Sequence, residues 1–255
     1  MAELFDVSGK RAAIIGGTGA LGGRFARCLA SAGAEVTVLG RSTERGHAVV
    51  DDIIQAGGRA AFLSVDVVDR GSLEAAGATL EGTGGTDILV NAAGVNSSTP
   101  FADLQDEEWD RLLDVNLSAV FRACQIFVPQ MRNRPGGASI INISSASSGP
   151  PLSRVFGYAA AKAGLNNVTQ YLARELAPDG IRVNAIIPGF FPAEQNRALL
   201  TRERVDNIVA HTAMRRLGEP EELDGALLWL ASSRASGFVT GALIHVDGGF
   251  SAMTI

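Results

Sequence analysis

Two rare side chains stand four residues apart in the middle of the sequence. The chain has 255 residues, 22 of them basic, yet lysine occurs only at positions 10 and 162 and tyrosine only at 158 and 171. Tyr158 and Lys162 enclose three alanines, so in a helix they share one face, one turn apart. A tyrosine titrates at about 10, and a nearby cation stabilises the phenolate. The pair is therefore a candidate for proton exchange with an alcohol or a carbonyl.

A serine precedes this pair at a useful position. Ser145 follows the apolar run 139–143, thirteen residues before Tyr158, where a strand is expected to end. Ligands of open α/β sheets bind outside the carboxyl ends of the strands. We therefore expect Ser145 to donate a hydrogen bond to a carbonyl oxygen held against the tyrosine.

The first apolar run leads into a glycine-dense turn. Residues 12–15 are Ala-Ala-Ile-Ile, residues 16–23 read Gly-Gly-Thr-Gly-Ala-Leu-Gly-Gly, and a helical pattern follows. Glycines let the backbone approach a pyrophosphate, and the N–H groups and the positive dipole end of the next helix stabilise its charge. This turn predicts a dinucleotide phosphate site. After the second run, Gly40 stands where an acid would repel a 2′-phosphate and Arg41 can pair with that phosphate, which favours NADPH over NADH.

Seven short apolar runs alternate with segments of helical period, which predicts one doubly wound, Rossmann-like α/β domain over 1–255. The expected seven-stranded parallel sheet has helices on both faces, because its strands are almost continuously apolar. The expected strands are Arg11–Ile15, Glu35–Leu39, Arg59–Ser64, Asp87–Asn91, Ser139–Ile143, Ile181–Ile186 and Ala242–Val246. Helices are expected near 21–32, 43–56, 69–80, 107–132, 157–177 and 220–232, with a polar helical insertion near 194–211.

Composition excludes several classes of protein. The net charge is −5 and no basic stretch occurs, which argues against a nucleic-acid partner. No secretory signal is visible, and no apolar stretch approaches the roughly 18–20 residues that span a membrane, so we expect a soluble cytoplasmic protein. Cys28 and Cys124 lack redox spacing and the three histidines are scattered, which predicts reduced buried thiols and no metal site. A GxSxG elbow and a P-loop are also absent from the sequence.

Further landmarks resemble those of the short-chain dehydrogenase/reductase family over about residues 9–249. The glycine turn resembles the family's TGxxxGxG motif, with Gly16 and Gly22 at its outer glycines. Residues 91–94, Asn-Ala-Ala-Gly, resemble NNAG, and Asp66 matches an acid that meets the adenine. Asn116 in the run Asp-Val-Asn, Pro188-Gly189 and the run 246–249, Val-Asp-Gly-Gly, match later landmarks.

The resemblance implies a catalytic tetrad of Asn116, Ser145, Tyr158 and Lys162. The tyrosine would be the acid/base, the serine would orient the carbonyl, the lysine would bind the nicotinamide ribose and lower the tyrosine pKa, and the asparagine would hold a proton-relaying water. The expected NADP(H) site, with NAD(H) as the weaker alternative, comprises Gly16, Thr18, Gly19, Ala20, Leu21, Gly22, Arg41, Ser42, Asp66, Val67, Asn91, Ala92, Ala93, Gly94, Tyr158, Lys162, Pro188, Gly189 and Phe191.

Four positions depart from the family pattern without touching the tetrad. Ile15 replaces a threonine, Ala20 a glycine, Ala92 an asparagine, and Ala193 a threonine that usually contacts the nicotinamide amide. We interpret them as tuning cofactor affinity.

The substrate is expected beneath a polar lid at about 189–214. A lid for a fatty or steroid substrate should be more apolar. The sequence of this segment resembles that of the family branch that acts on sugar acids such as gluconate, mannonate or fructuronate. Asn96, Ser145, Arg154 and Glu194 are the candidate substrate contacts, with Arg154 placed to pair with a carboxylate or, equally, to be a solvated charge. The alternatives are a 3-oxoacyl thioester reductase and a non-catalytic NADP-sensing regulator. The resemblance also suggests a homotetramer built on the helices near 107–132 and 157–177.

Overall fold

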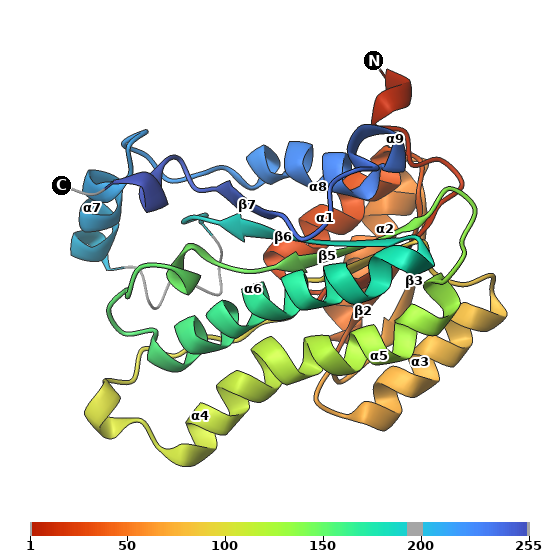
Figure 1. Ribbon diagram of the computed structural model, residues 1–255. Helices are drawn as coiled ribbons and strands as arrows, with labels where there is room; N and C mark the ends of the chain where they lie inside the picture. The colour runs from red at the N-terminus through yellow and green to blue at the C-terminus, as the bar shows by residue number, and fades with distance from the viewer. Residues whose placement is uncertain (1, 193–200, 254–255) are drawn as a thin grey trace.

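A seven-stranded, fully parallel sheet forms the centre of the molecule in the computed structural model, which describes residues 2–192 and 201–253 (Figure 1). Its strands are β1 (Arg11–Ile15), β2 (Glu35–Gly40), β3 (Arg59–Ser64), β4 (Ile88–Asn91), β5 (Ala138–Ile143), β6 (Ile181–Pro188) and β7 (Leu243–Val246). The predicted strands all occur, with ends within two residues of those expected, and the predicted fold class is confirmed.

The strand order, β3-β2-β1-β4-β5-β6-β7, places a change of direction between β1 and β4. The chain builds outward from β1 to β3 and then returns to pair β4 on the other side of β1. The loops that follow β1 and β4 therefore diverge, and a crevice opens between them at the carboxyl ends of the strands, where doubly wound folds bind ligands.

Helices cover both faces of the sheet. Helices α1 (Ala20–Ser31), α2 (Thr43–Gln55) and α8 (Asp224–Ala231) pack on one face, around a core that includes Phe25, Leu29 and Leu227. Helices α3 (Arg70–Gly82), α5 (Ala119–Met131) and α6 (Phe156–Leu176) pack on the other, around Phe127, Met131 and Leu165. Figure 1 shows α3, α5 and α6 in front of the sheet. Strands buried on both faces explain the continuous apolar runs of the sequence.

Two predicted helices differ from the observed ones. The helix expected near 107–132 consists of α4 (Asp106–Leu113), a π-helical turn (Asp114–Ser118) and α5. Such turns cluster at functional sites and cannot be read from 3.6-residue periodicity. The helix expected near 220–232 begins as a 3-10 turn at Pro220–Leu223 before α8, and α9 (Ser233–Ser236) follows it.

The continuous span Asp106–Met131 corrects one expectation. By length and composition alone it is apolar enough to cross a membrane, although 44% of its most apolar 18-residue window is buried. Its buried residues include Phe127 and Met131 of the sheet core.

Both cysteines are free and buried, as expected. The described residues hold no cluster of metal-ligating side chains.

The segment expected to form the lid is described in part. Helix α7 (Arg202–His211) lies within the predicted helical insertion. Residues 193–200, among them Ala193 and the candidate substrate contact Glu194, lie outside the described residues.

Candidate active site

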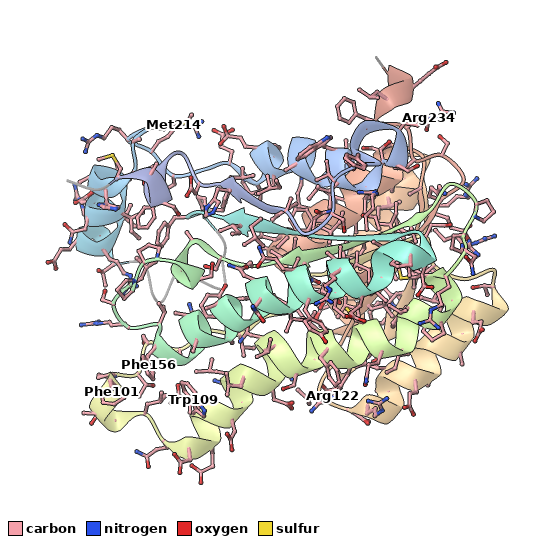
Figure 2. All side chains as sticks on the ribbon, viewed as in Figure 1. Phe101, Trp109, Arg122, Phe156, Met214 and Arg234 are labelled. Atoms are coloured by element: carbon pink, nitrogen blue, oxygen red, sulfur yellow. The ribbon has the colours of Figure 1, made fainter. Side chains whose placement is uncertain are left out.

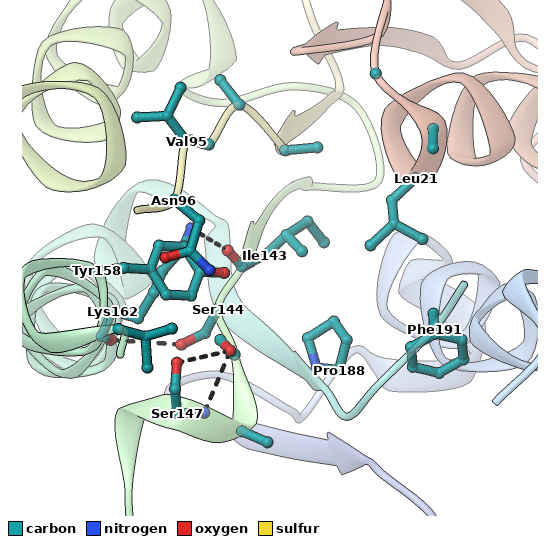
Figure 3. A pocket seen from close by; sticks show the side chains of 18 of the residues that line it. Leu21, Val95, Asn96, Ile143, Ser144, Ser147, Tyr158, Lys162, Pro188 and Phe191 are labelled. Atoms are coloured by element: carbon teal, nitrogen blue, oxygen red, sulfur yellow. Dashed lines mark hydrogen bonds between the residues drawn. The ribbon is translucent and has the colours of Figure 1, made fainter. Parts of the chain in front are cut away.

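A cavity of about 590 Å³ lies at the carboxyl ends of β1, β4, β5 and β6 (Figure 3). The residues that line it are Gly19, Ala20, Leu21, Gly22, Arg41, Arg45, Ala92, Ala93, Gly94, Val95, Asn96, Ser98, Arg111, Ile143, Ser144, Ser145, Ala146, Ser147, Leu152, Arg154, Val155, Tyr158, Lys162, Pro188, Gly189, Phe190, Phe191 and Arg204. Most of the expected site residues therefore share one cavity.

The amino end of α1 forms one part of the cavity wall. Gly19 precedes the helix without a side-chain cap, and the first turn, Ala20 to Gly22, faces the cavity without an acidic residue. The first N–H groups of a helix have no partner within the helix. They and the helix dipole suit a phosphate, so this wall fits the pyrophosphate of a dinucleotide.

Two glycines of the turn are required by close packing. A Cβ atom on Gly16 would lie 2.4 Å from the backbone nitrogen of Ala93, and one on Gly22 would lie 2.2 Å from the carbonyl oxygen of Gly16. Gly16 also has φ +80°, in the left-handed region. The turn is thus packed tightly onto the chain that follows β4, at the point where the sheet reverses its order.

The end of β2 contributes two arginines. Arg41 and Arg45 both line the cavity and both are exposed. Sequence reasoning found Arg41 but missed Arg45, although its position four residues later, in the first turn of α2, was a usable signal. Packing also requires a glycine at position 40, because a Cβ there would lie 2.5 Å from the Thr18 hydroxyl oxygen.

Seven expected site residues lie outside the lining: Gly16, Thr18, Ser42, Asp66, Val67, Asn91 and Asn116. Gly16 and Thr18 shape the turn, as described above. The Ser42 hydroxyl caps α2 by accepting from the Arg45 backbone N–H. Asp66 accepts from the Val68 N–H in the loop after β3, which also holds Val67. Asn91 and Asn116 are buried behind the cavity.

The α6 residues Tyr158 and Lys162 lie on one side of the cavity, with the loop after β5 beside them (Figure 3). The ammonium of Lys162 is 5.6 Å from the centre of the Tyr158 ring. The Ser145 hydroxyl accepts from the Ser147 hydroxyl and N–H, at 2.9 and 3.2 Å, which fixes its position at the end of β5. Serine, tyrosine and lysine thus meet as expected.

The direction of the tyrosine pKa differs from the expectation. Burial raises the pKa of Tyr158 above its ordinary value, and the Ser145 hydroxyl lowers it by less. Burial also lowers the pKa of Lys162, to about 8. The net rise in the Tyr158 pKa therefore follows from its desolvation, and a lowering of that pKa by Lys162 stays a prediction.

Lys162 is held almost fully out of solvent, with 3% of its surface exposed. Its ammonium donates a 2.8 Å hydrogen bond to the carbonyl oxygen of Ile143, the last residue of β5. An ammonium has three donors, so two remain for a ligand in the cavity.

Asn116 lies in the π-helical turn and braces the loop after β4. Its amide nitrogen donates to the carbonyl oxygens of Val95 and Leu112, both at 2.8 Å, and its oxygen accepts from the Val95 N–H at 3.3 Å. A Cβ on Gly94 would lie 3.0 Å from that oxygen and 3.9 Å from the Lys162 ammonium. Gly94 thus leaves the space in which the asparagine and the lysine come close.

A buried polar chain fastens α6 to the sheet. The Asn91 amide donates to the Asn142 oxygen at 2.8 Å, and the Asn142 amide donates to the Thr169 hydroxyl at 2.9 Å. Thr169 in turn donates to the Leu165 carbonyl oxygen. Because α6 carries Tyr158 and Lys162, this chain fixes both relative to the ends of β4 and β5.

The cavity also contains the candidate substrate contacts. Asn96 and Arg154 line it as expected, together with Arg111 from α4 and Arg204 from α7, which the sequence did not reveal. Arg154 has φ 62°, a strained backbone for a residue other than glycine. Arg204 donates to the Ser153 carbonyl oxygen at 2.9 Å, which joins α7 to this turn.

Comparisons with known proteins agree with this geometry. A family model described as enoyl-(acyl carrier protein) reductase matches residues 17–251. The uncharacterized oxidoreductase UxuB of Bacillus subtilis is 41% identical over 97% of this chain and 96% of its own length. A 3beta-hydroxysteroid dehydrogenase of Eggerthella lenta is 37% identical over 96% and 95%, and the 5-keto-D-gluconate 5-reductase of Escherichia coli K12 is 35% identical over 98% of both chains.

Among solved structures, a gluconate 5-dehydrogenase from Burkholderia cenocepacia J2315, in complex with NADP and tartrate, superposes with a TM-score of 0.94. It is 33% identical and covers 99% of both chains. The glycine turn, the polar residues around Tyr158 and these matches over the full chain lead to one conclusion: the protein belongs to the short-chain dehydrogenase/reductase family and is an NAD(P)-dependent oxidoreductase.

Proposed function

We propose that the protein reversibly reduces a keto-sugar acid to the corresponding hydroxy acid, with NADP(H) as the preferred cofactor. The observation that carries the proposal is that one cavity joins Ser145, Tyr158 and Lys162 with a helix amino terminus and with five arginines. Similarity to the gluconate 5-dehydrogenase and the 5-keto-D-gluconate 5-reductase supports the substrate class.

Each catalytic side chain has a role set by its position. When bound, the nicotinamide supplies or accepts the hydride. In reduction, Tyr158 donates its phenolic proton to the carbonyl oxygen, and the Ser145 hydroxyl donates a hydrogen bond to the same oxygen as its negative charge develops. Lys162, with two N–H donors to spare, binds the ribose hydroxyls. Asn116 holds the loop after β4 against the lysine, and its oxygen retains one acceptor position for a water.

The cofactor preference rests on Arg41 and Arg45. Their guanidinium groups stand at the end of β2, where a ribose 2′-phosphate would lie. Arg41→Ala should weaken NADPH binding by about 10- to 100-fold, the loss expected for one charge-assisted hydrogen-bonded pair. NADH binding should change by less than about threefold, because NADH lacks the phosphate. Fluorescence titration with both nucleotides measures this, and an equal loss for both would contradict the preference.

The reaction is tested by incubating the protein with NADPH and 5-keto-D-gluconate, 3-oxoacyl thioesters and a neutral 3-ketosteroid, while following the absorbance of the reduced nicotinamide. We expect turnover of the keto-sugar acid. Preferential turnover of the thioesters would favour a 3-oxoacyl thioester reductase, the alternative that the named relatives do not favour. Tight NADPH binding without turnover of any compound would favour the NADP-sensing regulator.

The proposal extends to the location, assembly and partners of the enzyme. We infer that it is a soluble cytoplasmic homotetramer that acts on a small-molecule substrate and binds neither nucleic acid nor membrane. The net charge of −5 and the absence of a basic run support the lack of a nucleic-acid partner. The segment at about 189–214 serves as the lid: Phe190, Phe191 and Arg204 contribute to the cavity wall.

A further inference from the structure

The charge of the cavity contrasts with that of the chain. The net charge of the protein is −5, yet the described cavity lining contains Arg41, Arg45, Arg111, Arg154, Arg204 and Lys162 and neither aspartate nor glutamate. A cavity lined by one sign of charge concentrates ligands of the opposite sign. A dinucleotide accounts for Arg41, Arg45 and Lys162, which leaves three guanidinium groups for another ligand.

The three arginines come from segments that meet at the start of α6. Arg204 bonds to the backbone of Ser153, next to Arg154. Helix α4, which carries Arg111, packs on the first turn of α6: the Trp109 and Phe156 rings are 5.6 Å apart, and a Cβ on Gly157 would lie 2.8 Å from the Leu112 side chain. Figure 2 shows Phe101, Trp109 and Phe156 gathered at this junction. All three arginines line the cavity.

The charges of the three arginines are not neutralised by the protein. Some arginines of the chain do meet carboxylates closely, as in Arg27 with Asp52 at 2.6 Å and Arg134 with Asp87 at 2.9 Å. Within the described residues, none of the three has a carboxylate oxygen within 4.0 Å. The pKa of Glu108 is lowered first by a hydrogen bond with Ser97 and least by the charge of Arg111. Both of its carboxylate oxygens accept from the Thr99 hydroxyl at 3.0 Å.

The turn that carries Arg154 has a left-handed backbone at this residue, with φ 62°. The exposed residues Asn133 and Arg215, outside the cavity lining, have the same conformation, so it sets the direction of the side chain without marking a ligand site. The neighbouring Arg204 bond to Ser153 holds the same turn from the side of α7.

We propose that Arg111, Arg154 and Arg204 form a carboxylate-binding cluster that makes the protein select anionic over neutral substrates. In this arrangement a sugar acid is held by its carboxylate at the cluster while its keto group lies at Tyr158 and Ser145 of the same cavity. Asn96 and Ser98 offer an amide and a hydroxyl for the hydroxyl groups between. This inference rests on the proposed reaction for the identity of the acid.

The cluster is tested by calorimetric titration of the NADPH-loaded protein with D-gluconate and with its neutral counterpart D-glucitol. Gluconate should bind at least about tenfold more tightly than glucitol. Arg154→Gln and Arg204→Gln should each weaken gluconate binding by about 10- to 100-fold, the loss of one charge-assisted contact, and leave glucitol binding unchanged. The proposed cluster would be overturned by unchanged gluconate affinity in both variants, or by equal affinity of the wild-type protein for gluconate and glucitol.

Two controls separate a local effect from a general one. Arg202→Gln, on the same helix but outside the cavity lining, removes the same charge and should leave gluconate binding within about twofold. The NADPH affinity of each variant should also be unchanged, which shows that the fold is intact. Because binding is measured without turnover, a protein that reduces no keto-sugar acid but discriminates gluconate from glucitol through these arginines would refute the proposed reaction alone.

Discussion

At the scale of single residues, Tyr158 is the proposed acid that protonates the carbonyl oxygen. Tyr158→Phe retains the aromatic ring next to Lys162 and removes the proton that the carbonyl oxygen must receive. The rate of NADPH-dependent reduction should fall by about 100-fold or more, while the NADPH dissociation constant stays within about threefold. A steady-state assay combined with a fluorescence titration measures both, and a rate near that of the wild type would place the acid elsewhere.

Lys162 ties the chemistry of the site to the stability of the fold. Its pKa is lowered by burial from 10.5 to about 8, so between these values the unfolded chain binds more protons than the folded one. Stability therefore rises with pH through that window and is independent of this group below it. Between pH 7 and pH 9.5, unfolding of the nucleotide-free protein should become harder by about 2 kcal/mol from this group alone.

The measurement is urea denaturation at both pH values, with Lys162→Met as the control. The variant lacks the titrating ammonium and should lose that increment, which the difference between the two proteins isolates from all other groups. An equal pH response in both proteins would mean that the lysine titrates near its ordinary pKa in the folded state. Burial also raises the pKa values of Cys28, Cys124 and Tyr158, and these groups contribute with the opposite sign, the cysteines within the range and the tyrosine above it. The comparison with the variant removes the contribution of the cysteines.

At the scale of elements, the glycine turn between β1 and α1 supports the whole cofactor half of the cavity. Gly16→Ala places a Cβ against Ala93 and a side chain at φ +80°. Strain and overpacking together should cost roughly 2–5 kcal/mol, and the affinities for NADPH and NADH should both fall. Thermal unfolding and nucleotide titration measure these losses.

Gly57 provides the matched comparison. Its φ is +85° and nothing lies within 4 Å of the position of a Cβ, so Gly57→Ala introduces the strain without the collision. It should cost about 1–2 kcal/mol and leave nucleotide binding intact. Equal destabilisation by the two substitutions would show that the turn yields to the extra methyl group.

The sequence revealed the parts of the site that are local in the chain. Tyr158 and Lys162 lie within one helical turn, and Arg41 directly follows a strand, so type and spacing sufficed. Arg111 and Arg204 were missed because α4 and α7 reach the cavity only through packing on the start of α6 and its preceding turn. The π-helical turn at Asn116 was missed because periodicity is blind to one inserted residue. The rise in the Tyr158 pKa on burial was not predicted, because burial cannot be read from spacing.

At the scale of the whole molecule, assembly is the property still to be measured. Phe121 on α5 and Tyr171 on α6 are 49% and 61% exposed on the two helices on which a tetramer is expected. Phe121→Asp with Tyr171→Asp places charges on that surface, and burying such charges is costly. Sedimentation velocity should show tetramers for the wild type and smaller species for the double variant.

A comparable apolar side chain on the opposite layer serves as the control. Ile54, on α2, is 54% exposed, and Ile54→Asp should leave the sedimentation coefficient unchanged. A monomeric wild-type protein, or a double variant that still sediments as a tetramer, would remove α5 and α6 from the expected interface.

The scarcity of lysine has a practical consequence for attaching the enzyme to a solid support. Of the two side-chain amines, Lys162 is buried inside the cavity, whereas Lys10 is 26% exposed and donates to the Pro135 carbonyl oxygen. Lys10 directly precedes β1, at the amino ends of the strands, whereas the cavity lies at their carboxyl ends. Coupling to an amine-reactive resin through Lys10 would therefore orient every immobilised molecule with its cavity facing the solution.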